Sequence, residues 1–524
     1  MVDDRILALA KEILEDRGKP QSYLEIAALI EANGITDKDC VERFGYGNTF
    51  LLAKHIYEIY PELGISKSIK GGETEKRKSN WLMFLRYYSS GLFFAMPMVV
   101  MIFAMLILPY SLWTWMLYDV GRATGIGVGT ILSFIITGGF CQAIGRRGLF
   151  YIHQKEDILT KKVCFRLFRF GATTTILFGL LFLIINLLFG FLPNYIFWYA
   201  FIYYLFLSFL WLSLATLYML KRLFLCTVVI ALGILAVHIA FKFFGLDILF
   251  SHVIGLSVAI IGGLFFSYML LQRKAKKAEK EFRASDLPRI SMVIYSIFPY
   301  FLYGVLYFVF LFLDRVIAWT TPSRDSPYIL WFKVQYELGM VWALISLVLT
   351  IGVLQYSIEA FSRTVISEQK KVKARGVSDF NQRFINFYKN HLILFLFISI
   401  LSIIGVYSGM FLLNRIEIFK YVENFFNEIT YFVFFSACVG YVFLVWALFN
   451  GIFFFALSRP HFIIRAIIPG IICNFVVGFF LSRIFGHHFA VIGLLIGAFV
   501  FMIVSSIYAF RVFKHLDYYY YSAF

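Results

Sequence analysis

Long apolar runs separated by short polar or basic segments make up the chain from about residue 84 onward. A helix needs about 20 mostly apolar residues to cross a hydrocarbon core of roughly 30 Å. Twelve runs reach this length, so the pattern predicts an all-α polytopic membrane protein with twelve transmembrane helices. The predicted spans lie near residues 84–108, 124–143, 171–192, 195–219, 223–244, 248–271, 290–313, 334–356, 391–413, 430–456, 463–485 and 489–510.

Residues 1–75 follow a different pattern, in which short amphipathic stretches alternate with turn signals. Three stretches carry apolar side chains at helical spacing. These side chains are Ile6, Leu9, Ala10, Ile13 and Leu14, then Leu24, Ala27, Ala28 and Ile30, and finally Phe50, Leu51, Ile56 and Ile59. The pattern predicts a small acidic helical domain in the cytoplasm. A hydrophilic segment at 71–78 predicts a linker from this domain to the membrane.

The pattern of loops repeats along the membrane part of the chain. One half, 76–271, holds spans 1–6, and the other, 290–524, holds spans 7–12. Each half has a long basic segment after its second span, at 144–170 and 357–389, and a basic linker at 272–289 joins the halves. Because six is an even number, both halves enter the membrane from the same side. This predicts parallel repeats, an arrangement in which transporters place a substrate path at the repeat interface.

The composition excludes two classes of protein. Of the 524 residues, 60% are hydrophobic and 15% are charged, against roughly 45–50% and 25% in a soluble domain. The mean hydropathy is +0.79. The 63 Phe and 32 Tyr carry more apolar surface than a disordered segment keeps in water. The chain is therefore neither a soluble globular protein nor a disordered one.

The net charge of +17 raises the question of a nucleic-acid partner. Residues 1–75 carry a net charge of −5, whereas the rest of the chain carries +22. If the amino terminus is cytoplasmic, the inner segments hold 31 Lys and Arg and the outer side holds 8. The positive-inside rule then predicts a multi-pass protein of the cytoplasmic (inner) membrane with both termini in the cytoplasm. The basic surplus marks orientation, so we expect no nucleic-acid partner.

The sequence carries no motif of a catalytic or cofactor site. Walker A, H-E-x-x-H and G-x-S-x-G patterns are absent from it, so the chain is predicted not to be an enzyme and to need no cofactor. The run Gly125-Ile-Gly127-Val-Gly129 begins a span and follows no strand, which favours close helix packing over nucleotide binding. The six cysteines are scattered, which predicts free thiols and no metal site.

Ionisable residues at the spans give the strongest functional signal, because charge within a membrane is costly unless it faces a bundle interior or a wet cavity. Asp314 and Arg315 end the seventh span, and Tyr336 and Glu337 begin the eighth. Lys333 stands four residues before Glu337, so these two side chains can pair on one helical face. A substrate path or gate is one interpretation of these residues. An aromatic belt with snorkelling charges at the outer interface is the other.

Other polar residues and prolines also stand at or inside the spans. Asp119 and Arg122 repeat the combination of an acid and a base at the equivalent outer end of the first half. Polar residues deeper in the spans favour interhelical hydrogen bonds over ligand contacts; they are Gln142, Asn186 and Asn474. Prolines inside spans predict bends in the helices; they are Pro97, Pro299 and Pro469.

Several motifs resemble a known family. They are Leu313-Asp314-Arg315-Val-Ile-Ala-Trp319, Ser326-Pro-Tyr, Tyr336-Glu-Leu, Gln355-Tyr-Ser-Ile-Glu359-Ala-Phe-Ser-Arg363, Gln142-Ala-Ile-Gly-Arg146-Arg147 with Asp157-Ile-Leu, and the closing Leu516-Asp-Tyr-Tyr-Tyr-Tyr-Ser-Ala-Phe524. Residues 82–524 thereby resemble the Pel exopolysaccharide exporters of the multidrug/oligosaccharidyl-lipid/polysaccharide (MOP) flippase superfamily, which is MATE-like. The acidic domain at 1–75 departs from the family's short amino terminus.

The resemblance implies a V-shaped bundle with a central cavity between its halves, and export of a polysaccharide or its lipid-linked precursor by alternating access. The candidate path or gate residues are then Asp314, Arg315, Glu337, Asp119, Arg122 and Tyr336. Two alternatives within the superfamily are a lipid-linked oligosaccharide flippase and a drug/cation antiporter. An integral-membrane transferase fits less well, because the outer acidic residues are dispersed among different loops. A further possibility is that residues 1–75 dock a cytoplasmic glycosyltransferase or synthase.

Overall fold

The computed structural model divides the chain into two units, Met1–Leu85 and Arg86–Phe524. It describes residues 6, 9–10, 20, 22–32, 35–59, 80–279, 290–322, 326–369, 377–415 and 427–522. The predicted linker at 71–78 and most of the basic linker at 272–289 lie outside the described residues, as do Ile13 and Leu14 of the first amphipathic stretch.

The N-terminal unit contains three described helices, α2 (Tyr23–Ala32), α3 (Asp37–Phe44) and α4 (Thr49–Ile59). Its core consists of Ile6, Leu9, Ala10, Ile26, Ala27, Ile30, Cys40, Leu52, Ala53 and Ile56. Leu24, Phe50 and Leu51 are about half exposed, so the apolar side chains of these stretches do not all face the core. Both α2 and α4 have more apolar positions than one face can hold, and packing between the helices selects the stripe that is buried.

Side chains at the start of α3 tie the N-terminal unit together. The Thr36 hydroxyl and the Asp39 carboxylate each accept a hydrogen bond from the other residue's backbone N–H, which is a capping box. The Asp37 carboxylate accepts hydrogen bonds from the backbone N–H of Thr49 at 2.8 Å and from its hydroxyl at 2.9 Å. These two bonds hold the pKa of Asp37 below its ordinary value. The start of α3 is thus linked to the start of α4.

The second unit is built from long helices that match the predicted spans. They are α5 (Asn80–Leu92), α6 (Met96–Ile107), α7 (Val120–His153), α8 (Asp157–Phe189), α9 (Asn194–Met219), α10 (Leu223–His238) with the π segment Ile239–Phe243, α11 (Ile248–Glu279), α12 (Ile290–Trp319), α13 (Val334–Gln369), α14 (Val377–Arg415), α16 (Glu428–Ala456), α17 (Pro460–Phe485) and α18 (Ala490–Lys514), followed by the short α19 (Leu516–Tyr521). Among the described residues, 11 single helices can each cross a membrane. The bent pair α5 and α6 makes a twelfth span when it is counted as one, so the predicted number of spans is confirmed.

The first span is broken rather than continuous. Helices α5 and α6 meet at an angle of 60°, and Pro97 occupies the first turn of α6, where its missing N–H costs no hydrogen bond. The bend predicted at Pro97 is therefore confirmed. Pro299 and Pro469 lie inside α12 and α17.

The long basic segments at 144–170 and 357–389 are mostly helical. Helix α7 continues to His153, and α8 already begins at Asp157. Likewise α13 continues to Gln369, and α14 begins at Val377. Lys and Arg are good helix formers, and beyond the apolar run their charges reach water or headgroups while the backbone keeps its helical hydrogen bonds. The connections are thus much shorter than the sequence pattern predicts.

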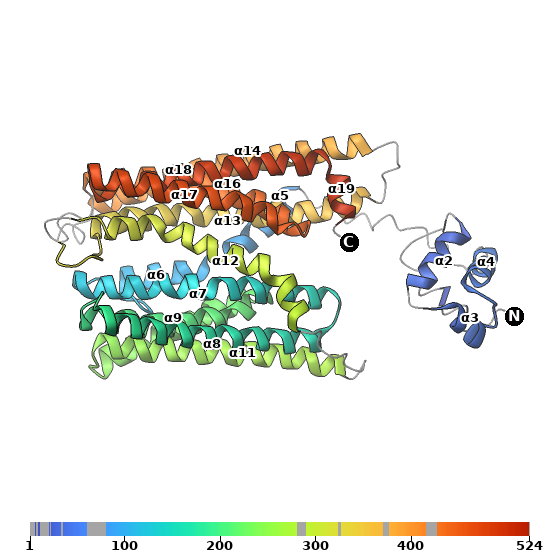
Figure 1. Ribbon diagram of the computed structural model, residues 1–524, viewed down its shortest axis with the longest axis horizontal. Helices are drawn as coiled ribbons and strands as arrows, with labels where there is room; N and C mark the ends of the chain where they lie inside the picture. Colours follow the sequence, from blue (N-terminus) through green and yellow to red (C-terminus); the bar gives the residue numbers. More distant parts are fainter. Residues whose placement is uncertain are drawn as a thin grey trace. The chain divides into compact units, whose positions relative to one another are not determined.

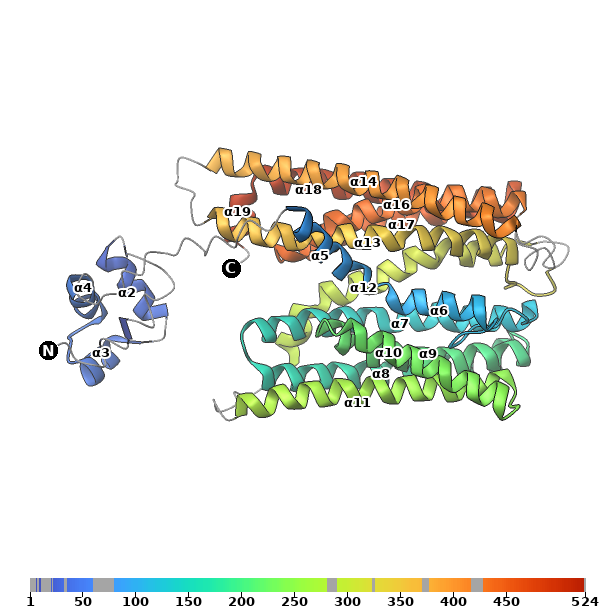
Figure 2. The same ribbon diagram turned by 180° about the vertical axis from the view of Figure 1, so that it is seen from behind.

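Two groups of helices pack side by side, and α12 lies between them. In Figures 1 and 2, α6 to α11 form one group and α13 to α18 form the other. Helix α12 packs against α7 of the first group and α17 of the second. Helix α5 instead lies beside α13 of the second group, since Gly91 of α5 packs directly against Gly352 of α13. Thus α5 and α6, the two parts of the first span, contact different groups.

Helix α7 contacts other segments at both ends and at its middle. Near its start, the Thr124 hydroxyl accepts a hydrogen bond at 3.0 Å from the N–H of Phe332, in the connection between α12 and α13. Near its end, Arg146 donates at 2.8 Å to the hydroxyl of Ser458, between α16 and α17. Midway, Gly138 of α7 and Gly304 of α12 approach so closely that a Cβ on Gly304 would lie 2.6 Å from the Gly138 carbonyl oxygen.

Glycines also bring α7 close to α9. A Cβ on Gly125 would lie 2.6 Å from the Ile196 carbonyl oxygen, and a Cβ on Gly129 would lie 2.5 Å from that of Ala200. These distances are shorter than any real van der Waals contact, so only glycine fits at either position. The predicted role of this glycine run in helix packing is confirmed.

Candidate functional site

A buried ion pair joins α12 to α13 in the second group of helices. The Arg315 guanidinium lies 2.7 Å from a carboxylate oxygen of Glu337, and the two side chains are only 11% and 7% exposed. Glu337 stands in the first turn of α13, where the helix dipole favours a negative charge. The sequence prediction placed these two residues at the ends of neighbouring spans, and the structure brings them into direct contact.

An arginine from α17 supports the end of α12 that carries Arg315. Arg483 donates to the carbonyl oxygens of Ile317 at 3.2 Å and Thr320 at 3.3 Å. The last carbonyls of a helix have no partner within the helix, so Arg483 satisfies two of them and adds a positive charge at the negative end of the helix dipole. This contact fixes the position of the last turn of α12.

A second carboxylate lies within the same cluster. The Tyr336 hydroxyl donates to one oxygen of Asp314 at 2.6 Å, whereas the other oxygen of Asp314 is buried without a hydrogen bond. The Trp319 indole N–H donates to Glu337 at 2.9 Å. The Tyr441 side chain of α16 lies beside the Arg315 guanidinium. We call Asp314, Arg315, Trp319, Tyr336, Glu337 and Tyr441 the acidic cluster.

The acidic cluster has more acid than base and sits in an apolar environment. When both carboxylates are ionised, two negative charges face one guanidinium. Phe312 contributes a ring 5.6 Å below the Arg315 guanidinium, and the fully buried Phe434 and Met340 belong to the surrounding core. An uncompensated negative charge in such surroundings is costly. The arrangement can therefore take up a proton or a small cation.

The predicted pairing of Lys333 with Glu337 is wrong. Glu337 is bound by Arg315 and Trp319, and Lys333 donates instead to the Ser326 hydroxyl at 2.6 Å. Lys333 precedes the first residue of α13, so the two side chains do not share a regular helical face. The spacing rule on which the prediction rested holds only inside a helix.

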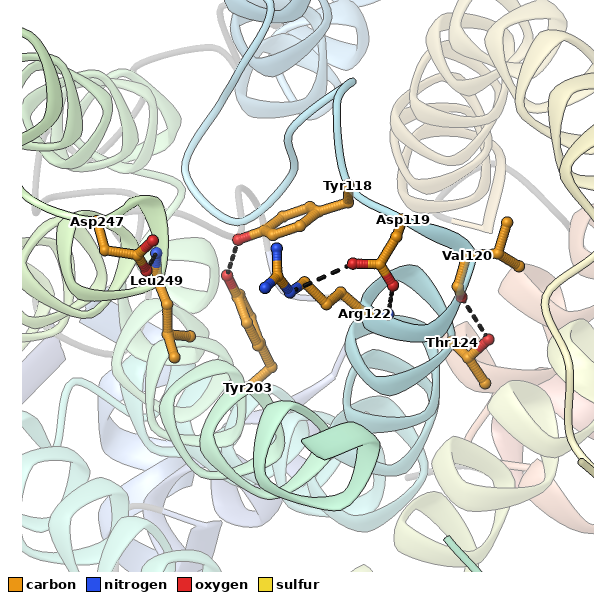
Figure 3. Close-up of polar contacts among 8 residues, drawn as sticks. All are labelled: Tyr118, Asp119, Val120, Arg122, Thr124, Tyr203, Asp247 and Leu249. Carbon is orange, nitrogen blue, oxygen red and sulfur yellow. Dashed lines mark hydrogen bonds and ion pairs between the residues drawn. The ribbon is translucent and has the colours of Figure 1, made fainter. Parts of the chain in front are cut away.

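The candidate residues of the first half lie in a different environment. Asp119 is the N-cap of α7 and accepts a hydrogen bond from the Arg122 N–H at 2.9 Å. The Arg122 side chain also pairs with the Asp119 carboxylate at 3.3 Å, and the two side chains are 47% and 54% exposed, respectively (Figure 3). The resemblance between the halves therefore extends to residue type but not to burial.

A hydrogen-bonded network of tyrosine and histidine side chains near Asp119 was not predicted. The Tyr203 hydroxyl lies 2.5 Å from Nδ1 of the fully buried His252. The Tyr118 hydroxyl lies 3.2 Å from that of Tyr203, and Figure 3 shows the two hydroxyls pointing toward each other. A parallel contact joins the Tyr110 hydroxyl to His238 at 2.7 Å. Histidines inside apolar runs were the available signal for this network.

The two asparagines that stand deep in the predicted spans, Asn186 and Asn474, make different hydrogen bonds. Asn474 of α17 donates to the Phe310 carbonyl of α12 at 3.3 Å, which confirms the predicted interhelical hydrogen bond. Asn186 bonds instead to the backbone N–H and carbonyl of Leu192, just after its own helix. The prediction of an interhelical bond is wrong for Asn186, because the end of α8 leaves backbone groups that a nearby amide side chain can satisfy.

Solved structures of transporters have the same architecture. A structure of MATE in complex with MaD5 matches with a TM-score of 0.57 at 14% identity, over 83% of this chain and 96% of that one. The chain has a MATE-like fold. Similar values hold for a MOP superfamily transporter from Pyrococcus furiosus, described as having a binding pocket of reversed polarity (TM-score 0.56, 13% identity, 82% and 96% covered). They also hold for MATE in complex with MaL6 (TM-score 0.54, 14% identity, 83% and 97% covered).

The MATE-like fold, together with the long apolar helices, makes this a multi-pass membrane protein. No family model matches the sequence, and no curated protein matches it significantly. At 12–15% identity the solved structures carry the fold alone. These structures assign neither a substrate nor a role for the acidic cluster to this chain.

Proposed function

We propose that this chain is a MATE-like transporter that exports an extracellular polysaccharide, or its lipid-linked precursor, across the cytoplasmic membrane by alternating access. The observation that carries the proposal is the buried acidic cluster inside a MATE-like bundle. Buried charge in such apolar surroundings costs stability, and in membrane proteins this cost is generally linked to function. The motifs that resemble the Pel exporters include Asp314, Arg315, Tyr336 and Glu337, and they supply the substrate class.

In this proposal the acidic cluster is the switch of the transport cycle. Uptake of a proton on Glu337, or of a cation beside its carboxylate, offsets the negative charge of Glu337, which weakens its attraction to Arg315. Since these residues belong to α12 and α13, the change alters how α12 is held against the second group of helices. Asp119 and Arg122 serve as a solvent-facing gate at the start of α7. The chain makes and breaks no covalent bond in this cycle.

Neutralising the acidic cluster should reduce export. Hydrogen bonds to charged groups contribute about 1.5–3 kcal/mol, so we expect Glu337→Gln or Asp314→Asn to lower the rate by about tenfold or more. Secreted polysaccharide is measured in cells that depend on this chain, alongside the amount of protein in the membrane. Glu428→Gln is the matched control, because Glu428 is an exposed glutamate in the first turn of α16. Undiminished export by both cluster variants would refute the switch.

The same variants identify the class of substrate in vesicles that contain the purified protein. The proposal expects a lipid-linked sugar to cross the membrane and this movement to slow in Glu337→Gln. Movement of a cationic drug without movement of the sugar would instead assign the chain as a drug/cation antiporter. In that case the acidic cluster retains its role while the proposed substrate is wrong.

The acidic N-terminal unit is part of the proposal as a docking domain for a cytoplasmic glycosyltransferase or synthase. The net charge of −5 on residues 1–75 favours a basic protein surface over nucleic acid. We expect deletion of residues 1–75 to abolish co-purification with the synthase while the vesicle assay stays unchanged. Loss of vesicle transport in the deletion would contradict a pure docking role.

A further inference from the structure

A basic hollow lies between α8 and α11, away from the acidic cluster. Its volume is about 970 Å³. Four basic and three aromatic side chains line it; they are Lys161, Lys162, Arg166, Arg169, Phe165, Phe168 and Tyr268. Within the described helices, this lining contains no acidic side chain. The hollow therefore concentrates positive charge next to aromatic surface.

The bases are held in place on one side of α8. Lys161 donates a hydrogen bond to the Gln272 side chain of α11 and lies 5.5 Å from the centre of the Tyr268 ring. At 100° per residue, Lys162, Arg166 and Arg169 fall within one third of the helix circumference. Both helices lie at the edge of the bundle in Figures 1 and 2. The four charges therefore form a basic wall on the outer side of the first group of helices.

An exposed apolar strip continues from the hollow along the same face of α8. Leu177, Leu180 and Ile184 are 60%, 49% and 52% exposed. They follow Arg166 by 11, 14 and 18 residues, which places them on its face of the helix. Eighteen residues of helix span about 27 Å, close to the roughly 30 Å of a hydrocarbon core. The basic end of the strip thus lies at headgroup level when the strip lies in the acyl chains.

We propose that this hollow binds the headgroup of an anionic phospholipid, whose acyl chains lie along Leu177, Leu180 and Ile184. Arginine forms paired hydrogen bonds with phosphate, and lysine adds further charge. Basic pockets between transmembrane helices are suited to anionic lipid headgroups. The amphipathic ring of Tyr268 suits the boundary between headgroup and chain, and Phe165 and Phe168 add apolar surface beside it. Charge and apolar length together favour a phospholipid over a soluble anion.

Binding is tested on the purified full-length protein by native mass spectrometry in detergent. Phosphatidylglycerol, phosphatidylcholine and soluble glycerol 3-phosphate are titrated separately. We expect phosphatidylglycerol to bind best and the double variant Lys162→Gln/Arg166→Gln to bind it about thirtyfold more weakly, because two bases are lost from the headgroup site. Both side chains lie at least partly at the surface, so the variant is expected to fold.

The matched control removes the same charge nearby. Arg273→Gln/Lys277→Gln changes two exposed bases at the end of α11 that do not line the hollow, and we expect its affinity for phosphatidylglycerol to stay within threefold of the unmodified chain. An equal loss of affinity in the control would mean that the lipid binds to general surface charge, and this would overturn the proposed site. Equal binding of phosphatidylcholine would overturn the preference for an anion. Equally tight binding of glycerol 3-phosphate would mean that the hollow binds a soluble phosphate, and the proposed lipid would be wrong.

Discussion

Replacing Arg315 by methionine is expected to lower the free energy of unfolding by about 3–5 kcal/mol. Methionine fills a similar volume, so the cost comes from charge rather than from a cavity. Without the guanidinium, the Glu337 carboxylate keeps only the Trp319 hydrogen bond, and Asp314 loses the neighbouring positive charge. Thermal and denaturant unfolding of the purified protein in one detergent measures the change.

Two further variants separate the ion pair from other effects of the substitution. Arg315→Met/Glu337→Met removes both partners, and it should recover most of the lost stability because no unpaired charge remains at this pair. Arg122→Met removes a base from the exposed pair with Asp119 and should cost less than about 1 kcal/mol. If the double variant is as unstable as the single one, the ion pair is not the reason for the loss.

Alanine at both Gly125 and Gly129 is expected to destabilise the protein by at least about 3 kcal/mol. Each new Cβ would meet a backbone carbonyl of α9 within 2.6 Å. Backbone cannot rotate away as a side chain can, so α7 and α9 must move apart along their shared face. The yield of monodisperse protein and the midpoint of thermal unfolding report this separation.

Replacing a glycine elsewhere on α7 by alanine should raise the stability of the protein instead of lowering it. A Cβ on Gly145 would meet nothing within 4 Å. Alanine is a better helix former than glycine by about 1 kcal/mol, so Gly145→Ala should stabilise the protein slightly. A comparable loss of stability in Gly145→Ala would show that α7 tolerates no alanine for reasons unrelated to α9.

The membrane architecture could be predicted from the sequence because its main determinant is local. An apolar run of sufficient length has to be a helix in the bilayer, where each backbone group needs a partner within its own segment. The ends of the helices are not determined in this way. Lys161 and Arg166 of α8 stand outside the apolar run, and only the folded chain shows that the helix continues through them.

The sequence named four residues of the acidic cluster, Asp314, Arg315, Tyr336 and Glu337, but not their contacts, and it did not name Trp319 or Tyr441 as candidates. Asp314 and Glu337 stood out because ionisable residues are rare at the ends of apolar runs. Their partners depend on how α12 and α13 pack, and Arg315 stands 22 positions before Glu337. The link between Tyr203 and His252 joins residues 49 positions apart. No helical spacing rule reaches across such separations.

The close approach of Gly138 and Gly304 brings the backbones of α7 and α12 together without leaving a gap between the helices. The Phe308 ring of α12 lies against Gly138, and the Gln142 side chain of α7 lies against Gly304. The Phe134 ring of α7 also stacks on Phe308, with 4.9 Å between the ring centres. Side chains of each helix therefore fill the space that the glycines of the other leave open, and a packed seam of this kind transmits displacement rather than absorbing it. We expect α7 and α12 to move together as one body.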